Sequence, residues 1–167
     1  MPRGLAMGSG RPSEVAVVGG HVVLELGPQH QAELERLGQR LDPPVCISKT
    51  LMTANWAAGI FVDQQLRGFI EARDRDEPGF VEVSLIVEPS WRGRGLGTAL
   101  LGAAICWGKA LGRSTLRMIF ARNDWSMRKL ASKANAQFDI VFDRMWADVS
   151  LLAFSGPHPN HTGEHNG

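Results

Sequence analysis

The stretch VSLIVEPSWRGRGLGTALL at residues 83–101 constrains the fold of this chain more than any other. Its apolar residues first alternate with other positions, which predicts a strand over Phe80–Val87. Pro89 ends that strand because proline cannot donate a ladder hydrogen bond. After a basic, glycine-rich turn, a helix is predicted over Thr98–Leu111, with Gly112 as its left-handed C-cap. This succession is typical of an anion-binding element, since the first helical turn has free N–H groups.

The turn between the strand and the helix combines positive charge with residues that lack side chains. Its candidate ligand-binding residues are Arg92, Gly93, Arg94, Gly95, Leu96, Gly97 and Thr98. Glycine adopts positive φ and lets a ligand come close to the backbone, and the helix dipole favours an anion there. We therefore predict a pyrophosphate-binding loop; the alternative is a surface turn without a ligand. The glycine spacing differs from that of a dinucleotide-binding turn, and no Gly-Lys-Ser/Thr follows as in a P-loop.

The spacing Arg92-x-x-Gly95-x-Gly97, after a strand ending in Val-x-Pro, resembles the coenzyme-binding signature of the GNAT acetyltransferase superfamily. The resemblance covers about residues 20–154. It implies acetyl-CoA as co-substrate, without a metal, and it places the loop amides on the coenzyme A pyrophosphate.

The same resemblance implies two further contacts with the coenzyme. The backbone of Leu85, Ile86 and Val87 would hold the pantetheine arm and the thioester, in a gap between two splayed parallel strands. A later helical segment resembles the second coenzyme-contact segment of the family, which usually carries an asparagine. Either Asn123 or Asp124 takes that place here, and an aspartate could cap the helix but could not donate a hydrogen bond as asparagine does.

The order of the predicted elements indicates an α+β fold. The strands and helices are expected at His21–Leu26, Pro28–Leu41 (helix), Trp56–Val62, Leu66–Arg73, Phe80–Val87, Thr98–Leu111 (helix), Ser114–Ala121, Asp124–Ala134 (helix) and, as one or two strands, Gln137–Phe154. A strand or lead-in at Val15–Val18 and a short helix within 45–55 stay open. Short turns make the middle strands antiparallel, and the helix crossover makes the next strand parallel. This is a GNAT-like mixed sheet, an antiparallel meander followed by a parallel splayed strand pair, with helices on both faces.

The chain is expected to form a single GNAT-like acetyltransferase domain at 14–154, between disordered segments at 1–13 and 155–167. The first segment is rich in Gly, Pro and Arg, and the last has no apolar residue that could dock. No apolar run approaches the ~20 residues that span a bilayer, and no signal-peptide core is present, so we expect a cytoplasmic protein without a membrane partner.

Positive charge is concentrated around the predicted loop. Residues 88–133 hold nine Lys/Arg against two acidic residues, a net charge of +7, which leaves −6 for the rest of a chain whose total is +1. A small polyanion such as coenzyme A accounts for this, although several of these residues are also consistent with a solvated helix face. A nucleic-acid partner is not expected, because the whole chain lacks the usual basic balance. The apolar late strand Val149–Phe154 is compatible with a homodimer.

The histidines and cysteines carry no metal or nucleophile signature. His21 and His30 are interpreted as isolated surface residues, and three further histidines lie in the tail. Cys46 and Cys106 are expected to be free thiols, the latter buried within its helix.

Acyl transfer to an amine requires a base for the ammonium, stabilisation of the carbonyl oxygen and alignment of the reactants. Glu82 and Ser84 share one face of the strand Phe80–Val87, and we predict them as catalytic residues, with Glu82 as the base directly or through water. Burial on a central strand would raise the pKa of such a carboxyl group towards that of a useful base. Glu71 on the neighbouring strand is the second candidate.

One departure from the family concerns the departing thiolate. Many members place a tyrosine on the later helix as general acid, whereas this chain contains no tyrosine and has Leu130 or Ala131 at the corresponding position. Water, Ser126 or Ser132 could supply the proton instead. The predicted function is an N-acetyltransferase that moves the acetyl group of acetyl-CoA by direct attack of a small-molecule or peptide primary amine. The alternative is a non-catalytic acyl-CoA-binding or regulatory module on the same fold.

Overall fold

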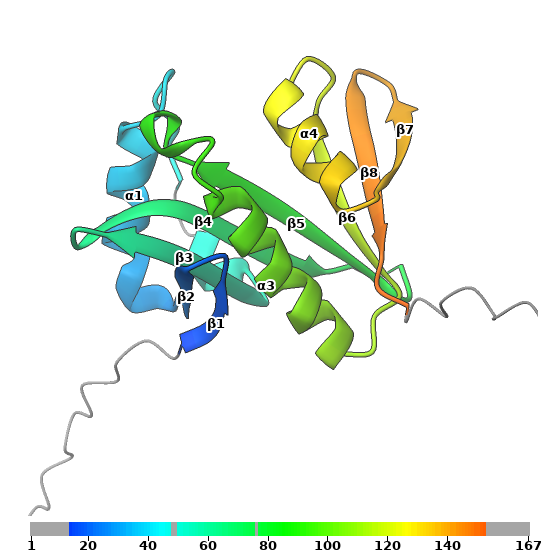
Figure 1. The fold of residues 1–167 in the computed structure, drawn as a ribbon, viewed down its shortest axis with the longest axis horizontal. Helices are drawn as coiled ribbons and strands as arrows, with labels where there is room; N and C mark the ends of the chain where they lie inside the picture. Colours follow the sequence, from blue (N-terminus) through cyan, green and yellow to red (C-terminus); the bar gives the residue numbers. More distant parts are fainter. Residues whose placement is uncertain (1–13, 48–49, 76, 153–167) are drawn as a thin grey trace, which may run out of the picture.

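One eight-stranded sheet organises the chain (Figure 1). The computed structural model describes residues 14–47, 50–75 and 77–152, so both segments predicted to be disordered lie outside the described residues. The strands are β1 (Glu14–Val18), β2 (His21–Glu25), β3 (Trp56–Val62), β4 (Gln65–Asp74), β5 (Phe80–Val87), β6 (Thr115–Ala121), β7 (Gln137–Val141) and β8 (Arg144–Ser150). They lie in the order β1-β2-β3-β4-β5-β6-β8-β7. Among the strands of the described ranges only the β5–β6 pair is parallel, which confirms the predicted fold class.

The helices fall close to their predicted positions. They are α1 (Gln31–Gln39), α2 (Thr50–Thr53), α3 (Leu96–Ala110) and α4 (Trp125–Lys133), with 3₁₀ turns η1 (Pro28–His30) and η2 (Pro89–Trp91). The first predicted helix therefore divides into η1 and α1 and ends two residues early. Helix α3 begins at Leu96 rather than Thr98, because its N-cap Gly95 has a φ of +84° and the helix starts directly after it.

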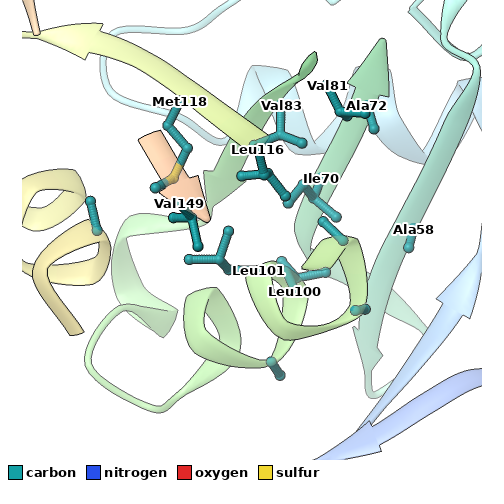
Figure 2. Close-up of a cluster of buried hydrophobic side chains, with 14 of the residues drawn as sticks. Ala58, Ile70, Ala72, Val81, Val83, Leu100, Leu101, Leu116, Met118 and Val149 are labelled. Atoms are coloured by element: carbon teal, nitrogen blue, oxygen red, sulfur yellow. The ribbon is translucent and has the colours of Figure 1, made fainter. Parts of the chain in front are cut away.

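The sheet is packed on both faces because neighbouring residues of a strand point to opposite sides. In Figure 2, Leu100 and Leu101 of α3 lie against Ile70 of β4 and Val83 of β5, and all four are nearly inaccessible. On the other face, Leu34 and Leu37 of α1 pack with Phe69 and Leu66. Each such buried side chain contributes roughly 1.5–3 kcal/mol of transfer free energy.

Strands β5 and β6 are joined along only part of their length. Their paired residues run from Phe80 and Thr115 to Val83 and Met118. Beyond this point β5 stays paired with β4 up to Val87, while β6 stays paired with β8. Figure 1 shows β6, β8, β7 and α4 turning away from β5 at one end of the molecule. The predicted splayed pair is thus present, and it opens at the end of β5 that leads into the glycine-rich turn.

Two smaller findings concern the surface. No helix in the described ranges is long and apolar enough to cross a membrane. Both cysteines are free and exposed, so the expectation of a buried Cys106 is wrong. Ala103 and Ala104 lie on the buried side of α3, and Cys106 lies off that stripe.

Candidate functional site

A pocket of about 620 Å³ lies where β5 and β6 separate, between the start of α3 and helix α4. Ten of the fourteen predicted site residues line it: Leu85, Ile86, Val87, Arg92, Gly93, Gly95, Leu96, Gly97, Thr98 and Asp124. The other four, Glu82, Ser84, Arg94 and Asn123, do not line it. The structure therefore brings the strand, the turn and the later helix together around one space.

The glycine-rich loop, residues 88–98, has the backbone conformation that its composition predicts. Gly93 and Gly95 have φ values of +74° and +84°, which L side chains rarely adopt. A Cβ added at Gly97 would lie 3.4 Å from Leu130 Cδ2, so the start of α3 faces α4 closely. The N–H groups of the first turn of α3 have no intrahelical acceptor and, together with Arg92, make this end of the pocket suitable for an anion.

Glu88 lies at the beginning of this loop. Among the described side chains it is the one charged residue that is buried, with 7% of its surface exposed. Its carboxylate lies 2.8 Å from Arg67 Nη1 on β4 and 3.3 Å from Arg40 Nε after α1. Its backbone N–H also donates to the Arg67 carbonyl, at 2.8 Å. The loop is therefore attached to β4 and to the end of α1 by a largely desolvated ion-pair network, which sequence analysis did not identify.

Trp91 links the same network to the loop cations. The guanidinium carbon of Arg67 lies 5.2 Å from the ring centroid of Trp91, and that of Arg94 lies 4.4 Å from it. Arg92 Nε donates to the Val87 carbonyl at 3.3 Å. Both loop arginines are thus oriented by contacts within the protein, and Trp91 itself lines the pocket.

His21 also contacts the loop. Its Nε2 lies 2.8 Å from the Arg94 carbonyl oxygen, 73 residues away in sequence. The expectation that His21 is an isolated surface residue is therefore wrong. No local pattern signals this contact, because it depends on how the first hairpin packs against α3.

Helix α4 forms the opposite wall. Asp124 is its N-cap and accepts a hydrogen bond from the Met127 N–H at 3.0 Å. Of the two candidates for the asparagine of the family, Asp124 lines the pocket and Asn123 does not. Lys129 and Lys133, one helical turn apart, also line the pocket and add positive charge.

The helix carries no general acid at the position where many family members have tyrosine. Ala131 is fully buried, and Leu130 lines the pocket with an apolar side chain. Of the two serines considered as proton donors, Ser126 lines the pocket and Ser132 does not.

A third wall comes from the segment after α1. Leu41, Asp42, Pro43 and Val45 line the pocket, and Arg40 immediately before them pairs with Glu88. The sequence carries no motif in this segment, which folds back on the end of α1 because the Val45 N–H donates to the Gly38 carbonyl at 2.9 Å. Their inclusion makes the pocket larger than the loop, β5 and α4 alone would form.

The predicted catalytic residues lie on the sheet face opposite α3, next to the point where the strands separate. Glu82 pairs with Arg75, with Oε1 and Nη2 2.6 Å apart, and Ser84 is exposed. Glu71 is the cross-strand neighbour of Ser84; its side chain is 12% exposed and lies 3.2 Å from Arg73 Nη2. The three candidate residues form a polar group at the closed end of the gap.

Arg117 on β6 holds this end of the sheet together. Its Nε and Nη2 donate to the two carboxylate oxygens of Asp148, each at 2.8 Å. The guanidinium also stacks on Phe80 and Trp146, at 4.4 and 4.3 Å. The hydrogen bond to Asp148 raises the pKa of Arg117, so this cation stays charged and is committed to the β5–β6–β8 contact.

Comparisons with known proteins agree with this geometry. The sequence profile of the acetyltransferase (GNAT) family matches residues 20–130. The GNAT domain of S. lividans PAT superposes with a TM-score of 0.69 at 12% identity, over 78% of this chain and 90% of that one. The structure of yncA from Salmonella typhimurium, which holds acetyl-CoA, superposes with a TM-score of 0.63 at 15% sequence identity. The match covers 81% of this chain and 96% of that one.

A third structure, the ribosomal-protein-S18-alanine N-acetyltransferase from Escherichia coli, gives a TM-score of 0.65 at 13% identity, over 81% of this chain and 97% of that one. At these identities the structural likeness establishes the fold alone. No curated protein matches this sequence significantly.

Proposed function

Because the chain belongs to the acetyltransferase (GNAT) family, we propose that it is an N-acetyltransferase that moves the acetyl group of acetyl-CoA to a primary amine by direct attack. Enzymes of this family use acetyl-CoA as the acetyl donor. The observation that carries the proposal is the 620 Å³ pocket, because it opens between β5 and β6 and is lined by the glycine-rich loop.

The loop would bind the pyrophosphate. Arg92 lines the pocket, and Arg94 stacks on Trp91, which also lines it, so the two would supply guanidinium groups to the anion. The amides of the loop glycines and the hydroxyl of Thr98 supply further donors. A charge-assisted hydrogen bond contributes more than a neutral one, and the N-terminus of α3 adds its dipole. The positive φ at Gly93 and Gly95 supports this role, since it favours glycine, whose lack of a side chain leaves the backbone open to the anion.

The end of β5 would hold the pantetheine arm. Leu85, Ile86 and Val87 pair with β4 on one side only. The Val87 carbonyl accepts from Arg92 Nε, and the other backbone groups that face the β6 side are available to a ligand with amides. An N–H of this strand can donate to the carbonyl oxygen of the thioester as negative charge develops there. Asp124 would orient the arm from α4, as an acceptor only.

For proton removal from the amine we propose Glu82, acting through water because it does not line the pocket, with Ser84 beside it. Glu71 is the second candidate, since it lies directly across from Ser84. For the departing thiolate, Ser126 or water replaces the absent tyrosine. A thiol with a pKa of about 8.5 leaves as thiolate at neutral pH at a cost of roughly 2 kcal/mol, so a strong general acid is not required.

The acceptor would be a small-molecule or peptide amine. The E. coli neighbour acts on an alanine of ribosomal protein S18, so peptide N-termini belong in the first acceptor panel. We also propose a cytoplasmic location, because both cysteines are free, as is usual in a reducing compartment.

The test is calorimetric titration of acetyl-CoA into the protein and into an Arg92→Ala/Arg94→Ala variant. We expect micromolar binding, weakened at least about 100-fold in the variant, since two charge-assisted hydrogen bonds are lost. An Arg36→Ala/Lys109→Ala variant removes two exposed charges elsewhere and should bind as the parent does. No binding by the parent protein would refute the proposal. Binding without turnover of any amine in the panel would favour the non-catalytic module.

The base is tested separately. A Glu82→Gln variant should keep its affinity for acetyl-CoA and lose about 100-fold in kcat, a typical contribution of general base catalysis. Unchanged turnover of this variant across pH would exclude Glu82, and the same loss in Glu71→Gln alone would transfer the role to Glu71.

A further inference from the structure

The first hairpin is anchored on the helix that follows the glycine-rich loop. Gly19 and Gly20 join β1 to β2 and have φ values of +57° and +80°, as in a type I′ turn. This two-residue turn sets Val18 opposite His21. Val18 lies against Gly102 of α3, with Cγ1 3.7 Å from the position that a Cβ would take there. Figure 1 shows the hairpin beside α3.

This packing brings the His21 side chain to the loop. Its Nε2 lies 2.8 Å from the carbonyl oxygen of Arg94. A carbonyl oxygen only accepts, so Nε2 carries the hydrogen and donates it. The ring is also close to the next residue, since a Cβ at Gly95 would lie 3.6 Å from Nε2.

The bond fixes the orientation of one peptide group. In a planar trans peptide the C=O and the N–H point in opposite directions. With the Arg94 oxygen held by His21, the N–H of Gly95 points away from His21. Gly95 lines the pocket, and in the described part of the chain its N–H has no backbone or side-chain acceptor.

We propose that His21 is a positioning residue, which holds the Arg94–Gly95 peptide with its N–H directed to the bound pyrophosphate. This deepens, and rests on, the proposed coenzyme binding. The position needs such support because Gly95 has a φ of +84°, and glycine reaches alternative conformations at little cost. A flipped peptide would direct the Arg94 carbonyl oxygen at the anion, exchanging a hydrogen bond for repulsion.

Arg94 is then held at two points. His21 binds its backbone from the β2 side, and Trp91 stacks on its guanidinium at 4.4 Å. The side chain and the following amide are therefore oriented independently, by contacts from different parts of the fold.

The test compares three variants with two ligands. His21→Phe keeps the ring bulk without a donor, His21→Gln keeps an N–H donor, and Val22→Ala changes an exposed neighbour on the same strand. Acetyl-CoA is compared with acetyl-pantetheine, which lacks the pyrophosphate. We expect His21→Phe to weaken acetyl-CoA binding about tenfold, the loss of one hydrogen bond to a charged group. His21→Gln and Val22→Ala should bind acetyl-CoA within about twofold of the parent, and no variant should change the dissociation constant for acetyl-pantetheine.

A merely structural role would give a different pattern, because both ligands would then be affected in parallel. A parallel effect on both ligands would overturn the proposal. So would unchanged acetyl-CoA binding by His21→Phe, or a loss in His21→Gln equal to that in His21→Phe.

A second measurement separates this proposal from the proposed function. The Gly95 amide is followed by NMR during titration with inorganic pyrophosphate. We expect a shift at Gly95 in the parent protein that is lost in His21→Phe. If the parent fails to bind acetyl-CoA but shows this shift, the acetyltransferase proposal fails and the role of His21 stands. If neither ligand has an effect, both are refuted.

Discussion

The two walls of the pocket are built differently. The glycine-rich loop is tied to β4, to the end of α1 and to β2 by Glu88, Trp91 and His21. The facing helix α4 has Ala131 as its one buried residue, whereas seven residues of α3 are buried. Stability is unevenly distributed in proteins, and segments with few buried contacts open most easily. One wall is thus held at several points of the fold, whereas the other has few buried contacts that would resist a local change.

The largest effect should come from removing the ion pairs that hold the glycine-rich loop. Glu88→Gln leaves Arg67 and Arg40 without their carboxylate in a largely buried place, so the free energy of unfolding should fall by about 3 kcal/mol. Urea denaturation measures the change. The control is Glu33→Gln, which removes an exposed pair with Arg36 and should cost less than about 0.5 kcal/mol. Equal losses in the two variants would mean that the loop is not held by its ion pairs.

The second largest effect should come from the positive charge that α4 adds to the pocket. Lys129→Ala/Lys133→Ala should weaken acetyl-CoA binding about tenfold at low salt, and the difference should shrink as ionic strength rises, because exposed charges are screened. Arg128→Ala is the matched control, since Arg128 lies over Trp125 and Phe138 instead of lining the pocket. A loss that persists at high salt would indicate a direct, desolvated contact instead.

The smallest effect concerns the attachment of α4. Asp124→Ala removes the N-cap and should lower stability by about 1 kcal/mol, while Asp124→Asn should cost only a few tenths. Hydrogen exchange should rise in α4 and stay unchanged in α3. Faster exchange in both helices would show that the walls are coupled.

Much of the fold follows from short-range patterns. The bounds of β3 and β5 agree with their predicted ranges, because alternation and turn residues lie within a few positions of each other. Asn135 adopts a φ of +57° directly after α4, a left-handed conformation that asparagine tolerates better than most residues. The glycine-rich loop was recognisable for the same reason, since its charge and its glycines are contiguous.

The residues that sequence analysis missed depend on distant contacts. His21 acts on a residue 73 positions away, and Glu88 depends on Arg67 and Arg40. The wall at 41–45 follows α1, and the position of that helix is set by its packing on the sheet. Local composition says nothing about such distant partners. The catalytic roles of Glu82 and Ser84 stay predictions.

The separation of β5 from β6 has a consequence for self-association. It leaves a sheet edge in the interior of the molecule, at Leu85–Val87, and unpaired strand edges are templates for pairing with other chains. This edge lies within a pocket, between the loop and α4. A strand of another protein would have to bring side chains on both of its faces into this recess. A slender, unbranched chain with amide groups needs less space, so the recess favours such a ligand over a second strand.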